Sequence, residues 1–120
     1  MKNNIAFIFS HPPHGTSIGR EGLDLVLATA NYSNNIALFF IGDGVLQITL
    51  NQDPKKILAR DYIRSFKLLS FYEIKTSYVC SDSLYEHGIP LDTKSIISTI
   101  ILPSDQIRLK LNNFNIILNF

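Results

Sequence analysis

The sequence has one cysteine, no tryptophan and only 18% charged residues, and these shortages exclude several classes of protein. A single cysteine cannot build a disulfide framework or a multi-cysteine metal site. Its 11 basic and 10 acidic residues leave a net charge of +1, which gives no broad basic field for nucleic acid. No apolar run approaches the roughly 18–20 residues of a membrane span, and Ile5–Phe9 is too short for the core of a signal peptide. We therefore expect a cytoplasmic protein with no membrane contact and no direct contact with nucleic acid.

What the chain has in excess is apolar surface. Its 120 residues (13.6 kDa) are 46% apolar, and the mean hydropathy is +0.14. This is the size of one domain, and we expect residues 1–120 to form it. A chain of this mass buries about two-thirds of its surface on folding, enough for a core without disulfides. Small domains have proportionally more surface and should be more polar, so the composition predicts that a partner covers part of this one.

Short apolar runs alternate along the chain with segments of helical periodicity. The runs that we expect to form strands are Ile5–Phe9, Ile36–Ile41, Thr76–Cys80, Ile96–Leu102 and Asn115–Phe120. Continuous runs of this kind are typical of strands that are covered on both faces. Helices are predicted between them, around Leu23–Ala30, Val45–Leu50 and Leu58–Tyr72, from Ser81 or Asp82 to Gly88, and from Ser104 or Asp105 onward. The order predicts a three-layer α/β/α sandwich with a mostly parallel five-stranded sheet.

Candidate functional residues are sought at the carboxyl ends of the strands, where sites form in open parallel sheets. Three segments follow such ends: Ser10–Arg20, Gly42–Gly44 and Cys80–Ser83. Cys80 is the sharpest candidate, because the free amides and dipole of a following helix N-terminus favour a thiolate. Such a thiolate could carry a persulfide. The opposing interpretation is a small, buried, apolar side chain at a strand end, and the residues alone leave both open.

The other two segments give weaker signals. His11 and His14 could bind a metal or shuttle protons, but no third ligand is spaced nearby, so we predict no metal site. Gly15–Arg20 has neither the glycine spacing nor the lysine of a phosphate-binding loop, and Gly42–Gly44 lacks the third glycine of a dinucleotide loop and is interpreted as a tight turn. No nucleophile-elbow motif supports a triad of Ser10, His14 and Asp43. We therefore predict no cofactor.

Motifs that run through almost the whole chain resemble those of the TusC/DsrF family, in the DsrE-like superfamily. In order they are Ala6-Phe7, Phe9-Ser10, Pro13-His14-Gly15-Thr16, Gly19-Arg20-Glu21-Gly22-Leu23-Asp24, Phe39-Phe40-Ile41, Asp43-Gly44-Val45, Ala59-Arg60-Asp61-Tyr62-Ile63, Phe66-Lys67-Leu68-Leu69, Val79-Cys80, Ser83-Leu84, Gly88, Ile117-Leu118 and Phe120. Each motif is weak by itself. Their order and spacing over the whole chain are specific.

The resemblance implies a DsrE-like fold and membership of the TusBCD complex, a hetero-hexamer of two TusB–TusC–TusD sets. Such a complex accepts sulfur as a persulfide from an upstream carrier and passes it to a TusE-like carrier. The sulfur ends in the 2-thio group of the tRNA wobble uridine, 5-methylaminomethyl-2-thiouridine. The partners implied are therefore TusB-like and TusD-like subunits, with the TusE-like carrier reached through the complex.

The resemblance also bears on Cys80. The family's sulfur-carrying cysteine is ascribed to the TusD/DsrE-type subunit, at the end of its third strand, and Cys80 occupies the corresponding place here. TusC-type chains are regarded as partner subunits, and Asp82 would oppose a nearby thiolate electrostatically. We therefore expect a non-catalytic, structural partner of the sulfur carrier. The alternatives are a sulfurtransferase that carries persulfide on Cys80, and a flavodoxin-like module that binds a small molecule. The contact surfaces are expected at Leu58–Tyr72 and the C-terminal strand.

Overall fold

A computed structural model gives the architecture, and it describes residues 4–12, 18–29, 35–48, 76–92 and 98–120. The helix expected at Leu58–Tyr72, and with it one of the two expected contact surfaces, lies outside the described residues. No helix in the described ranges is long and apolar enough to cross a membrane.

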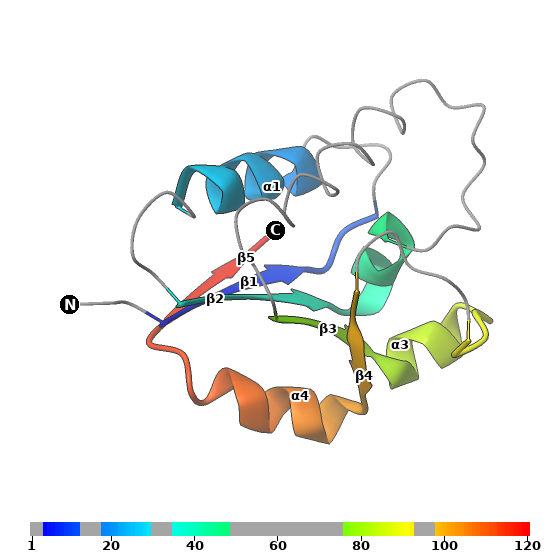
Figure 1. Ribbon diagram of the computed structural model, residues 1–120. Helices are drawn as coiled ribbons and strands as arrows, with labels where there is room; N and C mark the ends of the chain where they lie inside the picture. The colour runs from blue at the N-terminus through cyan, green and yellow to red at the C-terminus, as the bar shows by residue number, and fades with distance from the viewer. Residues whose placement is uncertain (1–3, 13–17, 30–34, 49–75, 93–97) are drawn as a thin grey trace.

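Five strands form one sheet, and every pair of neighbours is parallel (Figure 1). They are β1 (Asn4–Phe9), β2 (Asn35–Phe40), β3 (Thr76–Cys80), β4 (Ile100–Leu102) and β5 (Ile116–Asn119). Their spatial order is β4-β3-β2-β1-β5, so the chain builds the sheet outward from β1 to one edge and then returns to the other edge. The predicted α/β fold is confirmed, and the sheet that we expected to be mostly parallel is parallel throughout.

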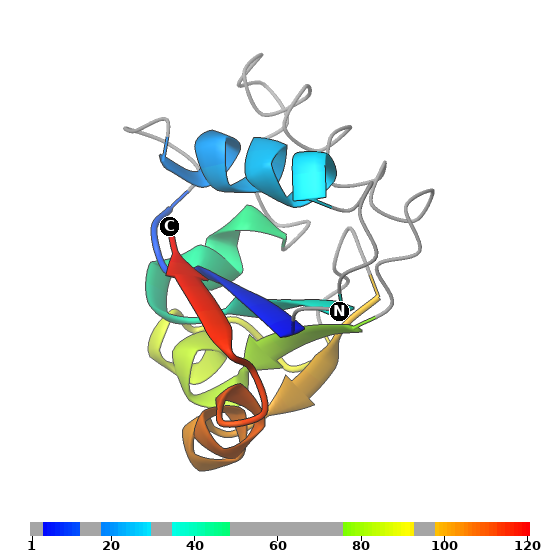
Figure 2. The same ribbon diagram turned by 90° about the vertical axis from the view of Figure 1, so that its left-hand side faces the viewer.

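The helices lie on both sides of this sheet, as Figure 2 shows with α1 above it and α4 below it. They are α1 (Ile18–Thr29), the short 3-10 helix η1 (Gly42–Gln47), α3 (Ser81–Glu86) and α4 (Ser104–Leu111). Crossover connections are right-handed. The connection from β1 to β2 and the one from β4 to β5 run in opposite directions across the sheet, and therefore place α1 and α4 on opposite faces.

Successive side chains of each strand point to opposite faces of the sheet, and the core is therefore divided into two clusters. One cluster lies on the α1 side, where Leu23 and Val26 of that helix pack with strand residues Phe7, Phe9, Leu38 and Phe40. The other lies on the α4 side, where Ile107 packs with Ala6, Ile8, Ala37, Phe39 and Tyr78. Four phenylalanines at the centre of the sheet have no exposed surface. Burying one such side chain contributes about 1.5–3 kcal/mol, so the continuous apolar runs of β1 and β2 account for much of the core.

Several element boundaries differ from the expected ones. The predicted helix Val45–Leu50 instead begins at Gly42 as 3-10 helix and ends at Gln47, with residues 49–50 outside the described ranges. Of the predicted strand Ile96–Leu102, Ile100–Leu102 form β4, Ser98 and Thr99 have no strand structure, and residues 96–97 lie outside the described ranges. Among the described strands, β4 lies at an edge of the sheet and pairs with β3 alone. Its extent is therefore fixed by one neighbour and not by its own apolar pattern.

Phe120, directly after β5, forms backbone hydrogen bonds that extend the pairing of β5 with β1. Its N–H donates to the Ile8 carbonyl at 2.7 Å, and its own carbonyl accepts from the Ser10 N–H at 2.8 Å. The ring stacks 6.2 Å from that of Phe7 and packs on Gly22 of α1, where a Cβ atom would come within 2.5 Å of the ring. A side chain at position 22 would therefore displace the terminal phenylalanine.

Candidate functional site

Cys80 is the last residue of β3 and the residue directly before α3. Its side chain is 4% exposed and lies in the cluster on the α4 side, together with Tyr78 and Ile107. The predicted helix from Ser81 or Asp82 to Gly88 begins at Ser81 and ends at Glu86, with Cys80 as its N-cap residue and no side-chain hydrogen bond from that cap. The cysteine thus lies at the strand end that the sequence predicts, but its thiol is buried among apolar side chains.

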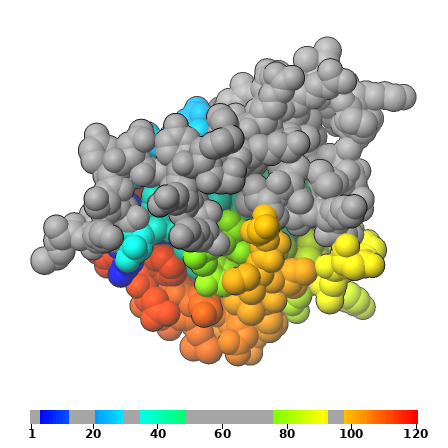
Figure 3. Space-filling model, in the orientation of Figure 1, coloured from blue at the N-terminus to red at the C-terminus, as the bar shows by residue number. Residues whose placement is uncertain are grey.

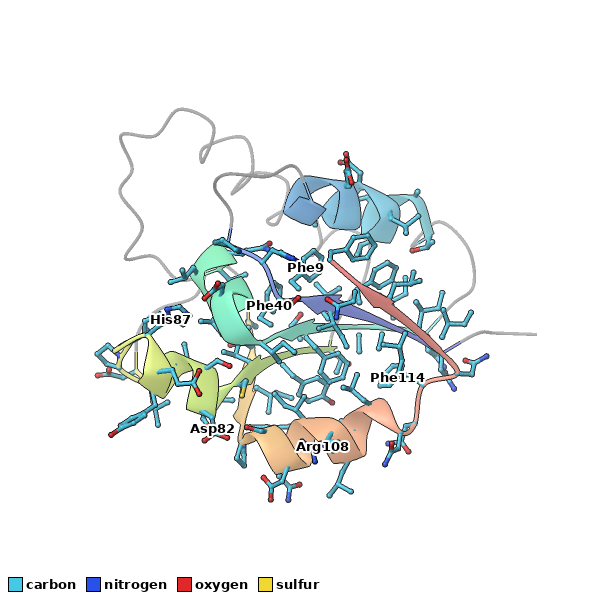
Figure 4. All side chains as sticks on the ribbon, turned by 180° about the vertical axis from the view of Figure 1, so that it is seen from behind. Phe9, Phe40, Asp82, His87, Arg108 and Phe114 are labelled. Atoms are coloured by element: carbon cyan, nitrogen blue, oxygen red, sulfur yellow. The ribbon has the colours of Figure 1, made fainter. Side chains whose placement is uncertain are left out.

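Within the described ranges, the thiol of Cys80 has one hydrogen-bond partner, the hydroxyl of Ser104 at 3.7 Å. Ser104 is the first residue of α4, and both its N–H and its hydroxyl donate to the carboxylate of Asp82, the N–H at 3.0 Å. Figure 4 shows Asp82 beside the start of α4. The Asp82 carboxylate therefore replaces the cap that α4 lacks, since Pro103, the residue before α4, has no side-chain hydrogen bond to it.

The charge of Asp82 decides which groups donate and which accept beside Cys80. The side-chain and backbone hydrogen bonds from Ser104 lower the pKa of Asp82, so this carboxylate is ionised at neutral pH and can only accept. The single hydroxyl proton of Ser104 is used by Asp82, which leaves the Cys80 S–H as the donor to the Ser104 oxygen. The Cys80 sulfur is therefore a buried hydrogen-bond donor, whereas nucleophilic chemistry needs a sulfur that other molecules can reach.

The segment Gly42–Gly44 follows β2, and its two glycines allow a backbone conformation and a close backbone approach that other residues would not. Gly42 has φ +54°, which glycine adopts without strain. A Cβ atom on Gly44 would lie 1.7 Å from the carbonyl oxygen of Phe9. The tight-turn interpretation agrees with this geometry, because the 3-10 helix η1 begins here and its first turn passes directly over the end of β1.

Polar contacts join η1 to α3, and the sequence analysis missed them. Nε2 of His87 lies 3.0 Å from Oδ1 of Asp43, and the Gly42 N–H donates to the Ser83 hydroxyl at 2.8 Å. Both pairs lie more than 40 residues apart in sequence, so no local motif marks them. The usable signal is topological, since β2 and β3 are neighbours and the segments after them meet at one edge of the sheet.

The histidines and the triad residues that the sequence analysis considered and set aside make separate contacts wherever the structure describes them. His11 is exposed, and its backbone carbonyl accepts from Nε2 of the buried Gln47 at 2.7 Å. Ser10 donates to Asn119 at 2.8 Å, and Asp43 is used by His87. His14 lies outside the described residues. In the ranges that the structure covers, no three His, Cys, Asp or Glu side chains are grouped closely enough to hold a metal ion.

Comparison with known proteins gives one family. The model of the DsrE/DsrF-like family matches residues 3–120. Proteins called "Protein TusC" are similar over 116 residues, which cover 97% of this chain and 98% of each relative. Identities are 49% for that of Buchnera aphidicola subsp. Acyrthosiphon pisum (strain Tuc7), 48% for that of Shigella flexneri serotype 5b (strain 8401) and 47% for that of Escherichia coli O9:H4 (strain HS).

A solved structure supports the fold. The crystal structure of the ychN protein from E. coli superposes on this chain with a TM-score of 0.78 and covers all of both chains. Their sequence identity is 16%, so this likeness is evidence for the fold alone.

Proposed function

The chain belongs to the DsrE/DsrF-like family, and from this premise we propose that it is a subunit of a sulfur-relay complex that supplies sulfur for 2-thiolation of tRNA. The observation that carries the proposal is its likeness to proteins called TusC, at 47–49% identity over 97% of the chain. The sulfur would arrive as a persulfide, leave to a TusE-like carrier, and end in 5-methylaminomethyl-2-thiouridine at the wobble position. We further propose that residues 1–120 act as one DsrE-like domain in the cytoplasm.

Within that complex, the proposed role is that of a structural partner to a sulfur-carrying TusD-like subunit. The surroundings of Cys80 support this role, because a persulfide carrier must present its sulfur to two other proteins in turn. A thiol that is 4% exposed and donates to Ser104 is poorly placed to do so. We propose TusB-like and TusD-like subunits as the direct partners, in a hetero-hexamer with two copies of each chain.

Co-purification tests the assembly. The full chain carrying an affinity tag is co-expressed with TusB-like and TusD-like subunits of one organism, and the eluate is weighed by native mass spectrometry. We expect a complex that contains all three chains in equal numbers. Recovery of the tagged chain alone, folded and free of both partners, would refute the proposal.

A Cys80→Ser variant tests the structural role. The assembled complex is loaded with persulfide by the upstream carrier, and each subunit is weighed intact for the added mass of one sulfur atom, about 32 Da. We expect the adduct on the TusD-like subunit and not on this chain, and we expect the variant complex to thiolate tRNA at the wild-type rate. An adduct on Cys80 together with loss of thiolation in the variant would make this chain a sulfurtransferase in its own right.

A further inference from the structure

The outward side of α3 carries the most exposed large apolar side chain of the described residues, Tyr85, at 85%. Asp82, Tyr85 and Glu86 are spaced at i, i+3 and i+4, which places them on one side of the helix, and all three are exposed. Ser83 and Leu84, on the opposite side, are buried. The tyrosine ring therefore buries almost no apolar surface and contributes little to the stability of the fold.

The loop that follows α3 adds more exposed apolar surface. The Ile89 N–H donates to the Leu84 carbonyl at 2.8 Å, and Ile89 is buried, so the start of the loop is held on the core. Beyond it, Leu91 is 57% exposed, and Pro90 is exposed as well. Figure 3 shows the end of α3 and this loop, in yellow-green and yellow, projecting together from one end of the molecule. We define the α3 tip as Tyr85, Glu86, Pro90, Leu91 and Asp92.

The surroundings of the α3 tip are acidic, although the whole chain has a net charge of +1. Residues 35–48 and 76–92 contain no lysine or arginine, and they contain three acids besides the Asp43 that contacts His87. Two of these acids, Glu86 and Asp92, form no ion pair with another described residue. The third, Asp82, accepts hydrogen bonds from an uncharged serine, which leaves its negative charge in place. The exposed apolar side chains are therefore bordered by charge of one sign.

This charge selects the kind of partner that the α3 tip fits. Nucleic acid is repelled, because its phosphates are also negative. The same tip of a second copy is repelled for the same reason. A protein with basic side chains around a pocket for the Tyr85 ring fits, since tyrosine is a common anchor of interfaces and opposite charges speed association. A small surface that mixes apolar and charged residues is typical of partners that bind and leave, whereas permanent interfaces are more hydrophobic.

We propose that the α3 tip binds the TusE-like carrier directly while the carrier collects sulfur from the complex. The inference rests on the proposed function, in which this carrier binds, leaves, and takes its sulfur onward to tRNA. A protein that works beside tRNA meets a dense row of phosphates, for which basic side chains are the complement. The same basic side chains match the acids of the α3 tip. The upstream carrier also binds and leaves, but it passes its sulfur to a protein. A subunit that carries no sulfur itself then has a second task in the relay, which is to hold the outgoing carrier on the complex.

Titration of the assembled complex with the TusE-like carrier tests this contact. The complex contains the full chain with TusB-like and TusD-like subunits of one organism, and binding is followed by biolayer interferometry at low and at high salt. Tyr85→Ala should raise the dissociation constant of the carrier about tenfold, because an aromatic anchor is lost. Glu86→Lys should slow association, and its difference from the wild type should shrink as salt screens the charges. Both side chains are exposed, so neither change disturbs the core.

The matched controls lie on α1, which Figure 1 shows well apart from α3. Leu25→Ala removes an exposed apolar side chain, and Asp24→Lys makes the same change of charge as Glu86→Lys. We expect both to bind the carrier as the wild type does.

Failure of this contact is distinguishable from failure of the relay proposal, which would show as subunits that do not assemble. A complex that assembles but binds the carrier equally well with and without Tyr85→Ala and Glu86→Lys would overturn the contact alone. So would an equal loss in the α1 controls, or an equal loss of binding to the upstream carrier. The isolated chain is titrated in parallel and should show the same ratio between variant and wild type. Absence of carrier binding by both the complex and the isolated chain would also overturn the contact.

Discussion

Replacement of Gly44 by alanine is the sharpest structural perturbation that this fold offers. A Cβ atom there would lie 1.7 Å from the Phe9 carbonyl oxygen and 2.4 Å from its carbonyl carbon, whereas real Cβ contacts essentially never fall below 3.0 Å. Phe9 cannot easily move away, because its carbonyl accepts the Ile41 N–H at 3.1 Å and its ring, with no exposed surface, stacks on Phe40 at 5.2 Å. The clash must therefore be relieved by separating η1 from the end of β1.

The size of the effect follows from comparison with another glycine. Gly88 has φ +66°, and no atom lies within 4 Å of the position that a Cβ atom would take there. Gly88→Ala therefore meets only the conformational penalty of a left-handed residue, about 1–2 kcal/mol. Overpacking against movable side chains costs about 1–3 kcal/mol. A clash with backbone should exceed that range, so we expect Gly44→Ala to lower the free energy of unfolding by more than about 3 kcal/mol.

Urea unfolding followed by circular dichroism measures both variants. With a slope of about 1.5 kcal/mol per M, the midpoint should fall by about 1 M for Gly88→Ala and by more than about 2 M for Gly44→Ala. Equal shifts for the two variants would refute the close approach of η1 to β1. So would a Gly44→Ala protein with the wild-type midpoint.

Three further predictions concern the pKa of Asp82, the burial of Cys80 and the contact between Gly22 and Phe120. Hydrogen bonds from Ser104 hold the pKa of Asp82 below its usual 3.8, so they stabilise the fold above that pH, and the stabilisation is lost as the pH falls through the lowered value. The stability advantage of the wild type over Asp82→Asn, measured as urea midpoints, should therefore be constant at neutral pH and shrink below pH 3.8; a gap that does not change with pH would contradict this. Cys80 should react with iodoacetamide, followed by mass spectrometry, far more slowly in the native chain than in urea, since it is 4% exposed, and equal rates would disprove its burial. Gly22→Ala should lower the free energy of unfolding of the wild type by about 1–2 kcal/mol. In a Phe120→Ala background it should have little effect, because the ring that the new Cβ atom strikes is gone. Additive losses of stability would show that residues 22 and 120 do not touch.

Local patterns in the sequence were enough to predict the layers and most of the elements. β1, β2 and β3 are continuous apolar runs because both of their faces are covered, and that pattern is visible without knowing the covering elements. The stripes containing Leu23 and Ile107 predict the inward sides of α1 and α4, and both residues are buried. The position of Cys80 at a strand end also follows from pattern alone.

The environment of Cys80 could not be predicted in the same way. Its polar neighbour Ser104 is 24 residues away and belongs to the next β–α unit. Sequence reasoning assigned the thiol to the N-terminus of α3, the adjacent helix, and treated Asp82 as a nearby charge. The fold places the Asp82 carboxylate beside Ser104, which donates its hydroxyl proton to it. The oxygen of Ser104 is then left as the acceptor for the Cys80 S–H.

The sequence by itself determined which segments are strands, which sides of the helices are buried, and which family the chain belongs to. Only the tertiary structure decided that β5 returns beside β1, that Phe120 packs on Gly22, and that His87 reaches Asp43. It also left Ile100 and Ile117 exposed at the two edges of the sheet. The physical reason is that the hydrophobic periodicity of a segment shows which of its sides are buried, but not which other elements bury them. The neighbours of a strand are chosen by the packing of the whole sheet, through contacts between residues far apart in the chain.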